Sequence, residues 1–386
     1  MKKIFCCLIG LFLLLCCGSK QTQIKRIYED GVEIVLNRLK PYRIPNEATA
    51  LVLDKEHVID SESPELLEAG LTDIYQFGID SSGFVYLTQR PRKDVKVIFK
   101  FDGMGRFQKS FGHVGQGPGE IEGSSYFGIS ALDDIFVLDA RRNRVLTFAP
   151  SGDLAKETLV PHMLTGAIPL ETGSFLVPDS QELPESGLEE QSLSIFDSQF
   201  NERKTFFRSK VPSYSGRTDK INAYYPNPIG SVTSNRIYVG IPGNDYEVYV
   251  YDLGGTLLRK IRKDYVAIAV TNEFRKEALD KVPSSMAERL YFPDYKPPFQ
   301  YIFADEASRL FVMTSEKDEA TGQNVCDIFS ASGVFIGRAA VGYYDRLRTL
   351  WEGLSLDVVA KNGHIYMLHE KENGYKELVV YKATWH

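Results

Sequence analysis

SSGFVYL, residues 81–87, places a polar turn before a short apolar strand, and the same arrangement recurs along the chain. Gly and Ser suit tight turns, whereas the aromatic and β-branched residues that follow favour extended structure. The pattern occurs six times, with the apolar portions FVYL (84–87), IFVL (135–138), SFLV (174–177), RIYV (236–239), RLFV (309–312) and HIYM (364–367). A repeat of this kind indicates one structural unit used six times.

A second pattern follows each copy: a strand that ends in an aromatic residue, then a tight turn, then another strand. VIFKFDGMGRFQKSF (97–111) is a full example. An apolar strand also precedes each unit, which brings the number of strands per unit to four. The sequence therefore predicts an all-β protein, a six-bladed β-propeller of four-stranded antiparallel blades. The aromatic position is held by Phe101, Phe148, Phe196, Tyr251, Phe329 and Tyr381.

The sixth unit lacks its outermost strand, because the chain ends soon after Tyr381. An unpaired strand edge invites aggregation, so a strand from the N-terminal region should complete this blade and close the ring. We expect GVEIVLN (31–37) to be that strand. The propeller would then occupy residues 31–386.

Uneven spacing between the repeats points to insertions. The segment 271–290 is predicted to be helical, because Phe274, Ala278, Leu279 and Val282 fall at helical spacing. Pro283 should end a first helix, and Ser285 with Glu288 would form a capping box for a second. The acidic segment DSQELPESGLEEQ (179–191) lacks the Asp/Asn spacing of a calcium-binding EF-hand loop, so a solvated hairpin is favoured over a calcium loop there.

The N-terminus predicts export. Lys2 and Lys3 precede an apolar run too short to span a bilayer. Leu14-Leu15-Cys16-Cys17 resembles the lipobox of bacterial lipoproteins, which implies a signal peptide at 1–16, acylation of Cys17 and a tether at 17–30. The alternative is an ordinary cleaved signal with chance cysteines.

Composition excludes some classes of partner. After removal of residues 1–16 the chain would carry 43 Lys and Arg against 51 Asp and Glu, a formal charge of −8. Nucleic acid is therefore not expected as a partner, since phosphate neutralisation needs a basic face. The mature chain would keep Cys17, with its sulfur acylated, and Cys326, so no intramolecular disulfide could form; Cys326 is expected in the core.

The glycine-rich stretch SFGHVGQGPGE (110–120) is predicted to connect two blades, because no helical pattern follows it to present backbone N–H groups to a phosphate. The longer stretch FDGMGRFQKSFGHVGQGPGEI (101–121), followed by an inner strand and then IFVLDARRNRVLTFAPSG (135–152), resembles the NHL-type repeat. GQGPGE (115–120) and DGVEIVLNRLKPY (30–42) resemble the six-bladed propeller lipoproteins common in Bacteroidetes. That resemblance implies a propeller fold in the cell envelope. A related propeller group contains lyases and lactonases with a metal in the central channel, but no residue here can be matched to their ligands.

Candidate binding residues are few, and the motifs H-E-x-x-H, C-x-x-C and G-x-S-x-G are absent from the sequence. His113 could face the mouth of the channel, or be an exposed loop histidine. Arg141, Arg142 and Asn143 could bind a carboxylate or sugar, or form a solvated turn. Aromatic platforms suit glycans and peptides but also pack between blades, which leaves both roles open for Tyr224, Tyr225 and Tyr295.

The leading functional hypothesis is a non-enzymatic binding or scaffolding propeller that holds a protein, peptide or glycan. It would be attached to the membrane through the lipid on Cys17, and we expect it to face the periplasm from the outer membrane, because Gly18-Ser19-Lys20-Gln21 lacks an acidic surface-export run. The alternative hypothesis is a metal-dependent hydrolase or lyase with its site in the central channel. The sequence identifies neither a cofactor nor a set of metal ligands.

Overall fold

The computed structural model describes residues 24–45, 47–92, 95–213, 220–224, 228–243, 245–280, 282, 284–342 and 358–386. The predicted signal peptide, and Cys17 with it, lie outside these residues. Among the described residues no helix is long and apolar enough to cross a membrane.

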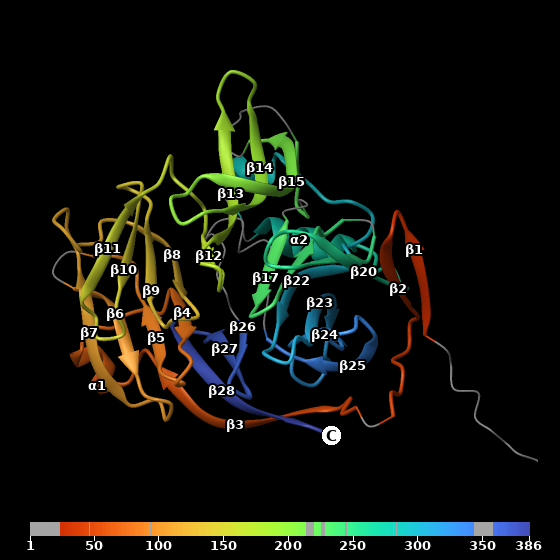
Figure 1. The fold of residues 1–386 in the computed structure, drawn as a ribbon, viewed down its shortest axis with the longest axis horizontal. Coiled ribbons are helices and arrows are strands. Elements are labelled where there is room, and N and C mark those ends of the chain that lie inside the picture. Colours follow the sequence, from red (N-terminus) through yellow and green to blue (C-terminus); the bar gives the residue numbers. More distant parts are fainter. Residues whose placement is uncertain are drawn as a thin grey trace, which may run out of the picture.

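The described strands form six four-stranded antiparallel blades, as predicted (Figure 1). Blade one contains β4 (Gln76–Ile79), β5 (Val85–Thr88), β6 (Lys96–Phe101) and β7 (Phe107–His113); blade two contains β8 (Ser124–Ile129), β9 (Ile135–Asp139), β10 (Arg144–Phe148) and β11 (Leu154–Leu159); blade three contains β12 (Ile168–Pro169), β13 (Phe175–Leu183), β14 (Leu188–Phe196) and β15 (Glu202–Pro212).

The second half of the ring repeats this order. Blade four contains β17 (Ile229–Thr233), β18 (Arg236–Gly240), β19 (Glu247–Tyr251) and β20 (Leu257–Lys263); blade five contains β22 (Phe299–Ala304), β23 (Leu310–Lys317), β24 (Asn324–Phe329) and β25 (Phe335–Ala340); blade six contains β26 (Val358–Lys361), β27 (His364–Glu370) and β28 (Lys376–Trp385) with β3 (Leu51–Asp60). A short helix, α1 (Pro64–Glu68), leads from β3 into blade one.

The same turn joins the two outer strands of blades one to five and joins β27 to β28 in blade six, which explains the repeat in the sequence. In each, a backbone N–H bonds the carbonyl oxygen three residues earlier, at 2.8–3.1 Å, and its residue has a positive φ. Glycine adopts this conformation without strain, and it occupies five of the six positions. The positions are Gly105, Gly152, Phe200, Gly255, Gly333 and Gly374.

The ring is closed by an N-terminal strand, but not by the one predicted. β3 pairs antiparallel with β28 along its whole length and completes blade six. The predicted strand, residues 31–37, instead contributes β2 (Val32–Asn37), which pairs parallel with β20 and enlarges blade four. An outermost strand is half-exposed and needs few apolar residues, so the charged segment 51–60 can fill that position, whereas Ile34 and Val35 are fully buried in β2.

The region before blade one therefore forms an N-terminal arm, residues 25–60, along the edges of three blades. It begins with β1 (Lys25–Glu29), paired with β2, so residues 25–30 belong to the folded domain rather than to the expected tether. At blade five the Asn37 side chain bonds the Gly333 carbonyl at 3.0 Å and the Phe335 N–H at 2.8 Å. Figure 1 shows the arm passing from β2 to β3.

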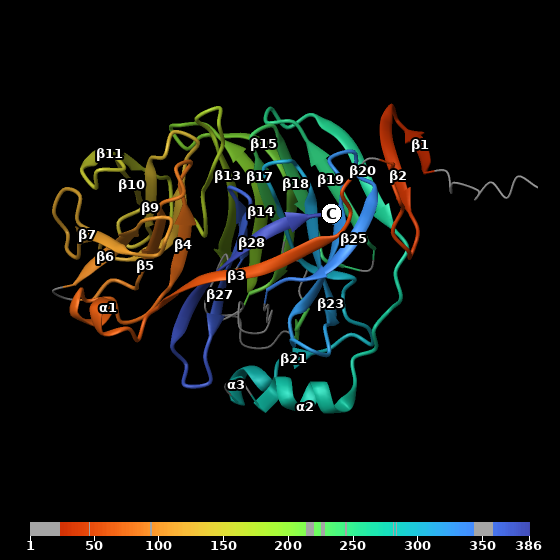
Figure 2. The same cartoon turned by 90° about the horizontal axis from the view of Figure 1, so that it is seen from below.

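The predicted helical insertion is present, as α2 (Asn272–Asp280) and α3 (Ser284–Ala287), and both project beyond the strands (Figure 2). The hydroxyl of Thr271 accepts the Phe274 N–H at 3.2 Å and caps α2. The predicted capping box is wrong, because α3 already begins at Ser284 and Ser285 lies inside it. Pro283 lies outside the described residues. After the helices, β21 (Leu290–Tyr291) pairs parallel with β16 (Ile221–Asn222).

Two loop predictions are confirmed. The acidic segment 179–191 is part of a long hairpin in which β13 and β14 pair from Phe175–Phe196 to Leu183–Leu188. The glycine-rich stretch connects β7 of blade one to β8 of blade two, and no helix follows it.

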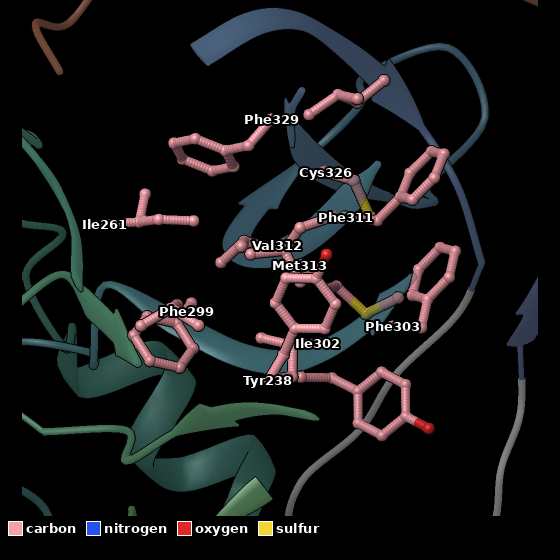
Figure 3. Packing of buried hydrophobic residues seen from close by; sticks show 14 of the residues in the cluster. Tyr238, Ile261, Phe299, Ile302, Phe303, Phe311, Val312, Met313, Cys326 and Phe329 are labelled. Carbon is pink, nitrogen blue, oxygen red and sulfur yellow. The ribbon is translucent and has the colours of Figure 1, made fainter. Parts of the chain in front are cut away.

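The largest core cluster joins blades four, five and six, and Figure 3 shows part of it. Ile261 of β20 packs with Phe299 of β22 and Phe329 of β24 in this cluster. Cys326 is fully buried there, as predicted, and burial raises the pKa of its thiol. A second cluster contains Phe77 of blade one and Tyr366 of blade six, so it closes the ring by packing.

Candidate binding groove between blades four and five

Two adjoining cavities form a groove between blades four and five, beside the helical insertion. The inner cavity has a volume of about 380 Å³, and Val266, Lys296, Asp327 and Arg338 are among the residues that line it. The outer cavity has a volume of about 950 Å³ and is lined in part by the N-terminal arm. The two cavities share Leu39, Tyr246, Lys263 and Tyr265. The inner volume lies in the range of ligand sites.

One wall of the inner cavity is formed by the two chain segments that connect the insertion to the blades. Residues 264–270 lead from β20 to α2, and residues 292–298 return to β22. Main-chain hydrogen bonds join them, from Val270 N–H to Asp294 O and from Lys296 N–H to Ile268 O, both at 2.8 Å. This pairing holds Val266, which is 71% exposed, beside the cavity.

A buried carboxylate lies beneath the groove. Asp327 of β24 is 1% exposed and accepts the Tyr246 hydroxyl at 2.8 Å and Arg338 Nε at 2.8 Å. Lys263 Nζ lies 3.2 Å from the same carboxylate. Burial, then the negative charge of Asp327, raises the pKa of Tyr246 well above its ordinary value, so this tyrosine is a neutral donor. A buried charge is stable only when it is paired in this way.

Most charges in the inner cavity are balanced. Arg338 bonds Asp327 and, through its Nη2, also pairs with Glu316 at 2.8 Å. Burial disfavours its charged form, but the hydrogen bond from Glu316 and the charge of Asp327 outweigh that effect, so the pKa of Arg338 is raised. Two cations, Lys263 and Arg338, thus face two anions, Asp327 and Glu316.

Lys296 is the cation left over. Its side chain is half-buried, and its ammonium lies 4.1 Å from the centroid of the Phe274 ring of α2. Within the part of the chain that the structure describes, this ammonium forms no ion pair or hydrogen bond. Burial lowers the pKa of Lys296. A partly desolvated cation without an anion is a place where an anionic ligand would be stabilised.

The binding residues predicted from the sequence are spread over the molecule. His113 ends the outer strand of blade one, exposed and beside Lys96. Arg141, Arg142 and Asn143 form an exposed turn between β9 and β10, where Arg142 lies 3.9 Å from Glu122. Neither location borders the groove.

The three predicted tyrosines divide differently. Tyr224 is 6% exposed and stacks on Phe274 at 6.2 Å, so it packs inside the insertion rather than forming a platform. Tyr225 lies outside the described residues. Tyr295 is exposed and immediately precedes Lys296, but does not line the groove. The predicted segment thus borders the groove through Lys296 rather than through Tyr295.

The described residues contain no group of three or more His, Cys, Asp or Glu side chains placed to hold a metal ion. The metal-dependent hypothesis therefore has no candidate ligand set within the described part of the chain.

Comparison with known proteins supports the fold. A family model described as a six-bladed beta-propeller, DUF5128, matches residues 85–222, about a third of the chain. A search of curated protein sequences found no significant match.

Solved structures with a similar fold include a candidate exported protein of Bacteroides fragilis, with 12% identity, 91% of this chain and 99% of that chain covered, and a TM-score of 0.51. A DUF4221-family protein of Bacteroides vulgatus has 11% identity, coverage of 88% and 99%, and a TM-score of 0.49. A gluconolactonase of Xanthomonas campestris has 8% identity, coverage of 88% and 99%, and a TM-score of 0.42. At such identities the likeness concerns the fold alone: the chain is a six-bladed β-propeller.

Proposed function

We propose that the protein is a non-enzymatic binding propeller of the cell envelope, and that the groove between blades four and five holds a protein, peptide or glycan. The observation that carries the proposal is the groove itself, a ligand-sized cavity with a buried charge network beneath it and exposed apolar side chains at its rim. Such a network costs desolvation energy, so its position at a cavity favours a role in recognition.

An envelope location is supported by the sequence before the blades and by the fold that the chain shares with a candidate exported protein. With the lipid on Cys17, Lys25 is eight positions further along the chain, and an extended chain of eight residue steps spans at most about 28 Å. Lys25 lines the outer cavity, so the groove would lie close to the membrane to which the protein is attached. We propose the periplasmic side of the outer membrane.

Site-specific crosslinking tests the use of the groove. A photo-crosslinking amino acid is placed at position 266 in the groove or, as a control, at position 132 in blade two, where Leu132 is equally apolar and 83% exposed. We expect a discrete crosslinked species in intact cells from position 266 and none from position 132. Equal crosslinking from both positions, or none from position 266, would exclude the groove as the binding surface.

Fractionation of the same cells tests the location. The substitution Cys17→Ser should release the protein from the membrane pellet, whereas Cys16→Ser should leave it there. Release by neither substitution would exclude Cys17 as the anchor.

A further inference from the structure

We infer that the inner cavity binds the free C-terminal carboxylate of a peptide whose last side chain is apolar, with Lys296 as the group that pairs with the carboxylate. This inference rests on the proposed function, because it specifies the ligand of the same groove. The juxtaposition that carries it is a half-buried ammonium, without an ion-pair partner among the described residues, beside apolar walls.

The first step of the argument is charge. Every other charged side chain of the inner cavity has an opposite partner, since Asp327 pairs with Lys263 and Arg338, and Arg338 with Glu316. A cationic ligand would have to displace one of these pairs or lie beside Lys296, and would be repelled. A carboxylate placed at Lys296 adds a missing ion pair without disturbing the others.

The second step is the chemistry of the walls. Five residues beside Lys296 present apolar surface, namely Tyr265, Val266, Ile268, Pro297 and Pro298. An apolar side chain next to the carboxylate would be stabilised by burial against them at roughly 25 cal/mol per Å². A sugar acid would instead place hydroxyl groups against these walls, where they would lose hydrogen bonds to water. The walls therefore favour a peptide over an acidic glycan.

The third step is size and continuity. A volume of about 380 Å³ equals that of roughly a dozen water molecules at about 30 Å³ each, which is enough for one apolar residue with its carboxylate. The inner cavity continues into the outer one past Leu39, Tyr246, Lys263 and Tyr265. The preceding residues of a peptide can extend along that path, whereas an isolated small acid would leave it unfilled.

Calorimetric titration of the intact mature protein tests the inference with three probes: acetyl-Ala-Leu-Leu with a free carboxylate, the same peptide as its C-terminal amide, and glucuronate. We expect the acid to bind at least tenfold more tightly than the amide, and glucuronate to bind more weakly than both. Lys296→Met keeps a long unbranched side chain beside Phe274 but removes the charge, so the variant should bind acid and amide equally. Lys156→Met, on exposed β11, is the matched control and should keep the tenfold preference.

Each outcome separates the inference from the proposed function. Equal binding of acid and amide by the unaltered protein, or a preference that survives Lys296→Met, overturns the role of Lys296 while crosslinking from position 266 can still stand. Tighter binding of glucuronate than of the peptide acid overturns the peptide in favour of an acidic glycan. Binding of none of the probes overturns the inference, whereas absence of crosslinking from position 266 is what overturns the proposed function.

Discussion

Single aspartates hold the outer hairpins in shape. The Oδ1 atom of Asp197 accepts the N–H groups of Gln199 and Asn201, both at 2.9 Å, and Asp102 and Asp252 bond the N–H groups of their own turns in the same way. These backbone hydrogen bonds are the main reason why the pKa of each of the three carboxyl groups is lowered. The folded state therefore favours their ionised form.

This preference predicts how stability depends on pH. A carboxyl group whose pKa is lower in the folded than in the unfolded state stabilises the fold above the unfolded value, about 3.9 for Asp, and this contribution is lost as the pH falls from there towards the folded pKa. The triple substitution Asp102→Asn, Asp197→Asn and Asp252→Asn keeps an acceptor oxygen but cannot titrate. We expect its melting temperature to fall less steeply than that of the unaltered protein below about pH 4.

Thermal unfolding between pH 7 and pH 2.5 provides the measurement. Asp54→Asn, at an exposed position of β3 outside any such turn, serves as the control and should follow the unaltered protein. Parallel curves for the triple variant and the unaltered protein would show that these turns do not contribute to acid unfolding.

Sequence-based prediction succeeds for single core residues but not for the residues that form the groove. Cys326 was predictable as a core residue because a lone apolar side chain in a strand needs no partner. The environment of Asp327 depends on Tyr246, Lys263 and Arg338, which lie up to 81 residues away in the chain. No local pattern encodes that assembly, so the sequence indicates the segment around Tyr295 without identifying Lys296 as the residue that lines the groove.

Among the connecting elements, the glycine-rich loop shows how two blades are joined. Arg144 of β10 is 6% exposed, and its guanidinium donates to the Glu120 carbonyl at 2.5 Å and to Glu157 at 2.8 Å. It also pairs with the fully buried Asp139 at 3.3 Å, and Asp139 in turn accepts the N–H of Gly123 at 2.9 Å. The loop therefore serves to dock blade one on blade two.

Removing this cation should be costly. Arg144→Met leaves the Asp139 carboxylate buried without its ion-pair partner, and loss of one member of a buried pair destabilises by about 3 kcal/mol or more. Adding Asp139→Asn to Arg144→Met should recover part of the loss, because the orphaned charge is then removed as well. Arg142→Met, two residues away and exposed, should change stability by less than about 0.5 kcal/mol.

Urea unfolding of the four proteins gives these free energies. A cost for Arg144→Met no larger than that for Arg142→Met would contradict the role of the loop as an inter-blade dock, and failure of Asp139→Asn to recover any stability would contradict the explanation through the buried charge.

Inner strands can be predicted from the sequence more reliably than outermost strands, because the two kinds of strand differ in burial. Inner strands are buried on both faces and therefore appear in the sequence as apolar runs. For this reason the sequence predicts five complete blades and most of a sixth. The outermost strand of blade six has three consecutive exposed residues at 54–56, and the polar residues 54–57 interrupt the apolar pattern of the segment LVLDKEHVID (51–60). The segment 31–37, which the sequence predicts for that position, instead extends a blade that is already complete.

At the scale of the whole molecule, the C-terminal residue meets the N-terminal arm at blade six. His386 N–H bonds the Ala50 carbonyl at 2.9 Å, and Ala50 N–H bonds the His386 carbonyl at 3.0 Å, just beyond the pairing of Leu51 with Trp385. The geometry is that of two hairpin strands whose connecting turn is missing. The ring is therefore held closed by strand pairing between distant parts of the chain, and the rest of the arm adds cover to blades four and five.

A circularly permuted chain tests whether β3 alone is enough to close the ring. The shortened chain 61–386 lacks the whole arm, so blade six should expose the open edge of β28 and the protein should aggregate. Joining His386 to Ala50 through Asn-Gly, which favours the two-residue turn of a hairpin, restores residues 50–60 behind the same chain. Both proteins lack β1 and β2, so the edge of β20 is open in each and the difference between them reports the contribution of β3 alone.

We expect the permuted chain to elute as a monomer in size-exclusion chromatography and to unfold in one thermal transition, while the shortened chain elutes as large aggregates. Monomeric behaviour of both would mean that the ring closes without β3, and aggregation of both would assign solubility to the cover that residues 25–49 place over blades four and five.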